Sequence, residues 1–240
     1  MIHVLLSRLR QGHRTNGYPT ECPSLPEKFR GRPEIKAGAC AEDCRACADA
    51  CPTDAIGLEP TPTIDLGKCL FCPACVEACP EGLIAYTHEH RVATRRREDL
   101  VVAPGREYEL AKGLEARLLK LFGRSLRLRV VSAGGCNGCE VDVNVLQTVV
   151  WDIARFGIQF VASPRHADGL IVCGPVTRAM ELALRKTYDA IPEPKLVIAV
   201  GACAISGGPY FRQDEQLGGA GSLLPVDLFI PGCPPHPLTI

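Results

Sequence analysis

The sequence predicts an α/β protein in two parts, a small cysteine-rich module and a larger parallel sheet covered by helices. Two blocks of four cysteines lie between residues 40 and 80. Short apolar segments and helical segments alternate from residue 126 onward, which is typical of a parallel sheet that is buried on both faces. Four more cysteines follow or extend three of the expected strands.

Length, charge and motifs limit the classes of function. The 240 residues suffice for two domains, and the formal net charge of zero implies no general attraction to nucleic acid or anionic lipid. No signal peptide and no apolar run of about 20 residues is present, so we expect a cytoplasmic chain that reaches a membrane only through partners. The absence of a G-x-G-x-x-G motif or a P-loop argues against direct nucleotide binding.

Residues 1–33 contain scattered glycine, proline and arginine, and we expect an extended arm that lies on another surface, or a loose terminus. Cys22 has no partner at a ligand spacing, so we predict no role for it. Residues 34–92 then form the cluster module, which is an internal repeat about 28 residues long. Neither half of the repeat can bury a core until both surround bound metal, so metal binding supplies the folding free energy.

The two cysteine blocks have the spacing of a bacterial two-cluster iron–sulfur protein. The second block reads C-x2-C-x2-C-x3-C-P, and the first has one extra residue between Cys40 and Cys44. In this arrangement three cysteines of one block and the fourth of the other hold each 4Fe–4S cluster. The predicted ligand sets are Cys40, Cys44, Cys47 with Cys79, and Cys69, Cys72, Cys75 with Cys51. The alternative is two zinc sites, but these usually use separated pairs or histidines, and no histidine lies between the blocks.

Residues 93–125 are expected to be a basic linker followed by an amphipathic helix. Leucines recur at helical spacing at positions 110, 114, 118 and 121, and Gly123 would end the helix. In residues 126–240, apolar runs predict strands at 126–131, 158–161, 170–173, 196–200 and 226–230. Helices are expected at 141–156, ending before Gly157, and at 179–190.

Four cysteines in this second half should meet at one edge of the sheet. Cys136 and Cys139 follow the first strand, Cys203 follows the strand at 196–200, and Cys233 follows the last strand. The carboxyl ends of parallel strands form one edge, where ligands bind. Four thiolates without histidine favour a third 4Fe–4S cluster over zinc or a single redox pair. Cys173 ends a strand and is expected to be a small buried residue.

Glu140 follows Cys139 at the start of the expected helix. Acidic residues are favoured there by the helix dipole, and a proton-relay role for Glu140 is the alternative.

Four motifs in this half resemble one family, in that family's order along the chain. They are Gly134–Glu140 (GGCNGCE), Pro164–Val172, Gly201–Gly208 and Val226–Pro235. The family comprises the small subunit of membrane-bound, energy-converting nickel–iron hydrogenases and the 20-kilodalton subunit of respiratory complex I. The separated pair Cys136 and Cys139 resembles the hydrogenase branch, including formate hydrogenlyase, since the complex I branch has adjacent cysteines there. The first ninety residues, with Phe29–Pro33, resemble the ferredoxin-like subunit of the same assemblies, as if two subunits were fused.

The resemblance implies a flavodoxin-like sheet domain with a proximal 4Fe–4S cluster on Cys136, Cys139, Cys203 and Cys233, preceded by a ferredoxin-like α+β domain with two more. The proximal cluster would lie beside the active site of a separate subunit. That partner would be a hydrogenase large subunit with a nickel–iron centre, or a complex I 49 kDa-like subunit that frames a quinone site. Membrane-arm and electron-donor subunits would complete an assembly on the cytoplasmic face of the inner membrane.

We therefore expect an electron-transfer subunit of a group 4-type nickel–iron hydrogenase, with three 4Fe–4S clusters and no catalytic residue of its own. The alternative is a complex I-like quinone oxidoreductase subunit. A free-standing ferredoxin and a structural zinc protein are less consistent with the α/β half and with the cysteine spacing. Two departures from the family are the extra residue before Cys44 and the short segment after Cys233, where relatives usually continue through another helix. The reaction direction, electron donor and ion coupling do not follow from the sequence.

Overall fold

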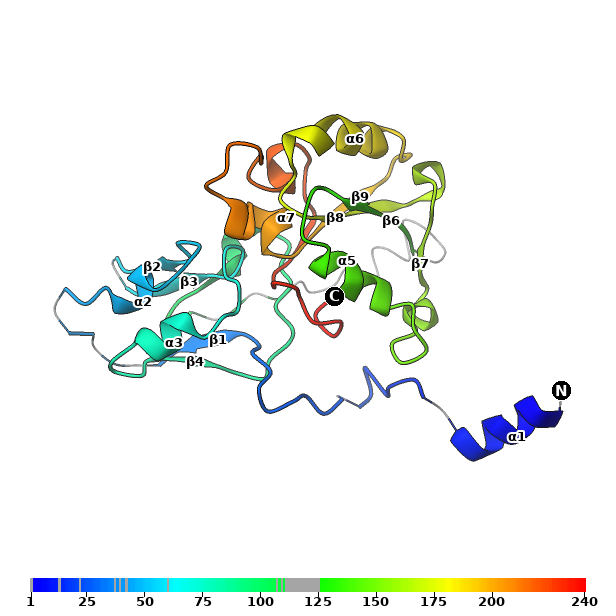
Figure 1. The fold of residues 1–240 in the computed structure, drawn as a ribbon, viewed down its shortest axis with the longest axis horizontal. Coiled ribbons are helices and arrows are strands. Elements are labelled where there is room, and N and C mark those ends of the chain that lie inside the picture. Colours follow the sequence, from blue (N-terminus) through cyan, green and yellow to red (C-terminus); the bar gives the residue numbers. More distant parts are fainter. Residues whose placement is uncertain are drawn as a thin grey trace.

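The fold comes from a computed structural model of the 240-residue chain (Figure 1). It describes residues 2–12, 14–21, 23–36, 38, 40, 41, 43–59, 61–106, 108, 110 and 126–240. The helix expected from the leucines after residue 110 lies outside the described residues.

The second half contains a five-stranded parallel sheet, as the sequence predicts. Its spatial order is β10-β9-β8-β6-β7, and every neighbouring pair is parallel. With β6 as the first strand in the chain, this is the 2-1-3-4-5 order of flavodoxin-like folds. The strands are β6 (Leu126–Ser132), β7 (Ile158–Phe160), β8 (Gly169–Cys173), β9 (Leu196–Val200) and β10 (Leu228–Ile230).

Alternate residues of the central strands enter two different cores. Leu170 and Val172 of β8 belong to the core that includes Leu184 of α6 (Arg178–Asp189). Ile171 and Cys173, on the opposite face, pack in the core that includes Val143 of α5 (Gly138–Val145). Helices α6 and α5 therefore cover opposite faces of the sheet (Figure 1), and this double burial explains why the strands are apolar throughout.

The helix expected over residues 141–156 is shorter than predicted. Helix α5 ends at Val145, and a short 3-10 helix, η2 (Ile153–Phe156), follows after turns. Asp152, just before η2, lies in the left-handed region with φ 45°, so no single α-helix runs through to residue 156. Gly157 follows η2 in the same region with φ 75°, as the predicted stop. The apolar residues between 145 and 151 continue the helical spacing, so the sequence predicted a helix that extends beyond Val145.

The cysteine-rich module is built from short elements. Strand β1 (Pro33–Ile35) pairs antiparallel with β4 (Ile84–Tyr86), and β2 (Ile56–Gly57) pairs with β3 (Thr63–Asp65). Helix α2 (Ala46–Asp49) follows the first cysteines, and α3 (Ala74–Ala78) occupies the equivalent place in the second repeat. Few residues are available for a core here, so the buried cysteines themselves, Cys47, Cys69 and Cys75, form part of it.

The first part of the expected linker belongs to this module. The 3-10 helix η1 (Arg97–Leu100) leads into β5 (Val101–Val102), which pairs with β3 and completes a three-stranded sheet. Arg97 donates two hydrogen bonds of 2.7 Å to the Asp65 carboxylate. This bidentate pair gives Arg97 of the basic stretch a structural partner within the module.

The two halves are joined by contacts between distant segments. Thr94 and Phe229 exchange backbone hydrogen bonds of 3.0 and 2.8 Å, so a single antiparallel rung covers the edge strand β10. The Ser206 hydroxyl donates to the Gly67 carbonyl at 2.8 Å. Buried residues of both halves belong to one continuous core. The cysteine-rich module is therefore packed against the sheet domain.

The N-terminal arm is only partly extended. Residues Ile2–Gln11 form helix α1, which projects from the rest of the molecule at the end of the arm (Figure 1). Every residue from Ile2 to Gln11 is exposed. The composition of the arm did not indicate this helix because glycine and proline are concentrated later in the arm. Among the described residues, no helix is long and apolar enough to cross a bilayer.

The sheet packing gives a testable prediction on α6. Leu184 is fully buried, whereas Leu182 on the same helix is 62% exposed. Leu184→Ala should lower the free energy of unfolding by roughly 2–5 kcal/mol, because it removes buried methyl groups and leaves a cavity. Leu182→Ala should change it by less than about 0.5 kcal/mol. Chemical unfolding of both variants measures the difference, and equal effects would contradict the packing.

Candidate functional site

The structure brings together the four cysteines predicted at the sheet edge. Cys136 lies in the loop after β6, Cys139 in the first turn of α5, Cys203 in α7 (Ala202–Ser206) after β9, and Cys233 directly after β10. Burial raises the pKa of the Cys139 thiol well above its usual range, and the charges of Cys203, Glu140, Cys233 and Cys136 raise it further. A Cβ on Gly138 would lie 3.5 Å from Cys136 Sγ and 3.8 Å from Pro234, so the loops of Cys136 and Cys233 meet at this edge.

The same environment acts on Cys203. Burial raises the pKa of Cys203 to about 12, and the nearby charges of Cys233 and Cys136 contribute in the same direction. The isolated site therefore favours protonated thiols, although metal ligation requires thiolates. Binding of a cation at this edge offsets the mutual repulsion of the thiolates and releases protons.

Glycines make space for the sulfur atoms. A side chain on Gly201 would collide with Cys139 Sγ, and Gly201 also has a φ of 91°, which side chains rarely adopt. A Cβ on Gly208 would lie 2.8 Å from Cys203 Sγ, and Gly208 has a φ of 53°. An all-thiolate donor set surrounded by backbone without side chains fits a bulky iron–sulfur cluster.

Glu140 and Cys173 lie next to this group without being among its predicted ligands. Glu140 is buried, and its Oε1 has no hydrogen-bond partner among the described residues. Its position in the first turn of α5 agrees with the helix-dipole interpretation, and the proton-relay role stays a prediction. Cys173 is fully buried in the core beneath the sheet, beside Cys139 and Val143, as expected for a small packing residue.

The second predicted ligand set of the N-terminal module shares one small cavity. Cys51, Cys69, Cys72 and Cys75 all line it, together with Tyr86. Burial raises the pKa of Cys69 to about 12, and the charges of Cys75 and Cys51 raise it further. The pKa of Cys75 is raised in the same way by burial, Cys72 and Cys51. The fourth cysteine of the first block therefore lies with the second block.

The first predicted set shows the reciprocal arrangement. The pKa of Cys47 is raised by burial and by the charges of Cys79 and Cys40. Cys79 is the fourth cysteine of the second block, and its place in the first ligand set stays a prediction. Cys40 is exposed and Cys44 is half-buried, which makes this the more open of the two sets.

The internal repeat extends to individual hydrogen bonds. The Ala55 amide donates to Cys51 Sγ at 3.3 Å, and the Leu83 amide donates to Cys79 Sγ at 3.4 Å. In both repeats the residue before the donor, Asp54 or Gly82, has a positive φ, of 51° and 59° respectively. Each Cys-Pro ending is thus a turn that directs an amide at the sulfur of the crossing cysteine.

The extra residue of the first block is accommodated ahead of Cys44. Asp43 and Phe71 directly precede the second cysteine of their blocks, and both have positive φ, of 59° and 54°. The backbone immediately before Cys44 is therefore the same as before Cys72, and the insertion lies between Cys40 and Asp43. A phenylalanine in the left-handed region is uncommon, and its amide donates to Cys69 Sγ at 3.3 Å.

Two features of the sites were not predicted. The Tyr86 hydroxyl donates to the Cys72 carbonyl at 2.8 Å and lies 3.9 Å from Cys69 Sγ, so a tyrosine supplies polar contact in the cavity. The pKa of Cys233 is raised by burial, by Cys136 and also by Cys72 of the N-terminal module. The sequence contains no spacing signal for either feature, because both depend on how segments far apart in the chain pack.

No three or more histidine, cysteine or acidic side chains converge as ligands of a single metal ion in the part of the chain that the structure describes. In a 4Fe–4S cluster each thiolate binds its own iron atom, so the sulfurs need not crowd around one ion.

Comparisons with known proteins match the two halves separately. Residues 136–240 match the family model of the NADH ubiquinone oxidoreductase 20 Kd subunit, and residues 39–83 match that of the 4Fe-4S dicluster domain. The probable membrane-bound hydrogenase subunit mbhJ of Pyrococcus furiosus is 42% identical over 125 residues, which are 52% of this chain and 75% of the relative.

Two further relatives come from different complexes. Formate hydrogenlyase subunit 7 of Escherichia coli is 43% identical over 129 residues, which are 54% of this chain and 51% of the relative. An NADH-quinone oxidoreductase subunit of Bacteroides thetaiotaomicron is 47% identical over 100 residues, which are 41% of this chain and 51% of the relative. The chain thus spans about half the length of these two relatives.

The glycine next to Cys139 gives a specific prediction. Gly201→Ala should displace the Cys139 sulfur and so reduce the iron held at the sheet edge, because its Cβ collides with that atom. Gly221→Ala is the matched control, since a Cβ there meets nothing within 4 Å. Iron and acid-labile sulfide per chain, measured after anaerobic purification, should fall in the first variant by about four atoms each. Full iron content in Gly201→Ala would contradict the assignment.

Proposed function

Because the chain belongs to the family of the 20 kDa subunit of NADH–ubiquinone oxidoreductase, we propose that it is an iron–sulfur electron-transfer subunit of a multi-subunit membrane complex. The relatives named above are subunits of oxidoreductase complexes. The observation that most supports the proposal is the cavity that Leu70 and Phe71, just before Cys72, line together with Cys233. It links a ligand set of the N-terminal module to the ligand set at the sheet edge.

Three ligand sets would hold three 4Fe–4S clusters. They are Cys40, Cys44, Cys47 and Cys79; Cys69, Cys72, Cys75 and Cys51; and Cys136, Cys139, Cys203 and Cys233. When bound, such a cluster accepts and releases single electrons at a potential set by its hydrogen bonds, charge and solvent exposure. The chain itself needs no substrate chemistry.

Backbone amides and burial around the cysteine sulfurs would tune the reduction potentials of such clusters. The amides of Ala55, Leu83 and Phe71 donate to cysteine sulfurs, and such donors stabilise the added negative charge of a reduced site. Exposure decreases from Cys40, which is exposed, to the buried Cys69 and Cys75. The shared core between the two halves keeps the sets at fixed separations.

The first set is the most exposed part of the module, which suits it to receive or release electrons at the surface. The second set would adjoin the sheet-edge set, since Leu70 and Phe71, just before Cys72, line one cavity with Cys233. The order along the molecule is therefore first set, second set, sheet edge. Cys136 and Cys233 are exposed at that edge, where a catalytic large subunit would dock. We expect this assembly to lie at the cytoplasmic face of the inner membrane.

Among the complexes of this family, we favour a group 4-type nickel–iron hydrogenase resembling formate hydrogenlyase. The two residues between Cys136 and Cys139 support this choice, because the resemblance to the hydrogenase branch lies in that separated pair. The large subunit would then carry the nickel–iron centre. The second candidate is a quinone oxidoreductase resembling complex I, which the similarity to the NADH-quinone oxidoreductase subunit supports.

The count of clusters is tested by metal analysis of the full chain. Anaerobically purified protein should hold about twelve irons and as many acid-labile sulfides. Cys203→Ala should lose about four of each, whereas Cys173→Ala should keep the full number because Cys173 packs in the core. Zinc with negligible iron and sulfide would overturn the proposal, and equal iron loss in both variants would overturn the ligand assignment.

The reaction of the complex is tested through its catalytic partner. The chain should co-purify with a large subunit, and the intact complex should take up or evolve hydrogen with a suitable electron carrier. Quinone reduction without any hydrogen activity would favour the second candidate. A chain that elutes alone, with no large subunit under any gentle solubilisation, would contradict both.

A further inference from the structure

Helix α1 has a narrow apolar stripe that no core residue of the described chain covers. Ile2, Leu5, Leu6 and Leu9 follow the i, i+3, i+4, i+7 spacing, so they share a stripe about 100° wide. Ile2 is 67% exposed and Leu9 is 81% exposed. A stripe of four large aliphatic side chains is costly to leave in water, which indicates that it is covered in the working protein.

The charge around the stripe is uniformly positive. Residues 1–20 contain three arginines, Arg8, Arg10 and Arg14, and no aspartate or glutamate. Arg8 and Arg10 project on either side of the stripe, by the same helical geometry. The neutral net charge of the whole chain therefore conceals a basic arm, and the acidic residues that balance it begin at Glu21.

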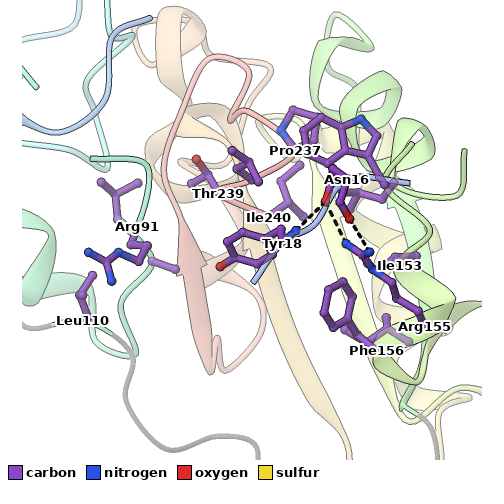
Figure 2. A pocket seen from close by; sticks show the side chains of 16 residues that line it. Asn16, Tyr18, Arg91, Leu110, Ile153, Arg155, Phe156, Pro237, Thr239 and Ile240 are labelled. Carbon is purple, nitrogen blue, oxygen red and sulfur yellow. Dashed lines mark hydrogen bonds between the residues drawn. The ribbon is translucent and has the colours of Figure 1, made fainter. Parts of the chain in front are cut away.

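The arm is fixed to the body a few residues beyond α1. The Asn16 amide donates to the Val150 carbonyl at 2.9 Å, and the Thr15 hydroxyl donates to the Val149 carbonyl at 2.8 Å. Arg155 donates to the Asn16 carbonyl at 2.6 Å and to its Oδ1 at 2.9 Å (Figure 2). These bonds hold the arm against one wall of a cavity of about 330 Å³.

The body surface at this attachment is also apolar. Val149 is 72% exposed, and Val150 and Phe156 are each 45% exposed. Because Asn16 bonds to Val150 and lies only five residues after Gln11, α1 is tethered within reach of this patch. The Arg155 guanidinium stacks over the Phe156 ring at 4.7 Å, so an arginine borders the patch as well. Helix and patch thus present the same combination of apolar and arginine side chains.

We propose that α1 binds in the plane of an anionic phospholipid bilayer, with the stripe in the acyl boundary and the arginines among the headgroups. Aliphatic burial combined with flanking cationic side chains is the recognised chemistry of interfacial helices. A groove on a partner protein is the other kind of occupant, and the absence of any acidic residue in residues 1–20 favours the anionic lipid surface. The contact adds a direct membrane link, and it does not rest on the electron-transfer role.

Vesicle flotation of the anaerobically purified full chain tests the proposal. Vesicles of phosphatidylcholine with phosphatidylglycerol should carry the chain, and vesicles of phosphatidylcholine alone should carry much less. Leu5→Ser with Leu9→Ser should weaken binding by roughly tenfold or more, because two aliphatic side chains no longer leave water. Val4→Ser is the matched control, since Val4 is 72% exposed on the opposite side of α1, and its binding should be unchanged.

The electrostatic part has its own variants. Arg10→Gln and Arg14→Gln should each weaken binding to the anionic vesicles by about fivefold at physiological salt, with little effect on neutral vesicles. Iron content should stay at the wild-type value in all five substitutions, which shows that the fold is intact.

Three outcomes would overturn the proposal. The first is a chain that floats with neither vesicle type, and the second is a leucine double variant that binds like the wild type. In the second case the arginines alone would account for the adsorption. In the third, the wild-type chain binds no vesicles, and the leucine double variant loses a partner subunit from the purified complex. That result would assign the stripe to a groove on the partner protein.

Discussion

The architecture depends on bringing together cysteine thiols that are distant in sequence, so that they can ligate the same cluster. Burial of these thiols disfavours the thiolate form that ligation requires. The parallel sheet meets this requirement by ending β6, β9 and β10 at one edge, where Cys136, Cys203 and Cys233 follow directly. Burial raises the pKa of Cys203 to about 12, so this thiol is protonated while no cation is bound. Thiolate ligation of a cationic group at this edge would therefore be coupled to the release of protons.

The same constraint explains why the two halves are packed together. The cysteine-rich module has little apolar core of its own, and its buried residues join those of the sheet domain. The rung between Thr94 and Phe229 and the bond from Ser206 to Gly67 fix the module beside β10 and α7. As a result, Leu70 and Phe71, just before Cys72, line one cavity with Cys233.

The sequence predicted much of this because cluster ligation and strand burial both leave local patterns. The Cys-Pro endings predicted the crossing of Cys51 and Cys79, and apolar runs predicted all five strands. Three features escaped prediction for physical reasons. Helix α5 ends at Val145, where turns begin, and no residue pattern marked that end. The Tyr86 contact and the cavity that Phe71 and Cys233 share depend on tertiary packing. Helix α1 was not predicted because the glycines and prolines that follow it made the whole arm resemble an extended segment.

The proposed electron path depends on the ligand set of Cys51, Cys69, Cys72 and Cys75 adjoining the one at the sheet edge. Electron paramagnetic resonance of the fully reduced chain tests this most directly, because unpaired electrons on adjacent clusters split each other's signals. We predict a split spectrum whose splitting falls to that of the two clusters of the N-terminal module when Cys203→Ala removes the sheet-edge set, while Cys173→Ala keeps the full splitting. A wild-type spectrum that is the simple sum of independent cluster signals would contradict this arrangement.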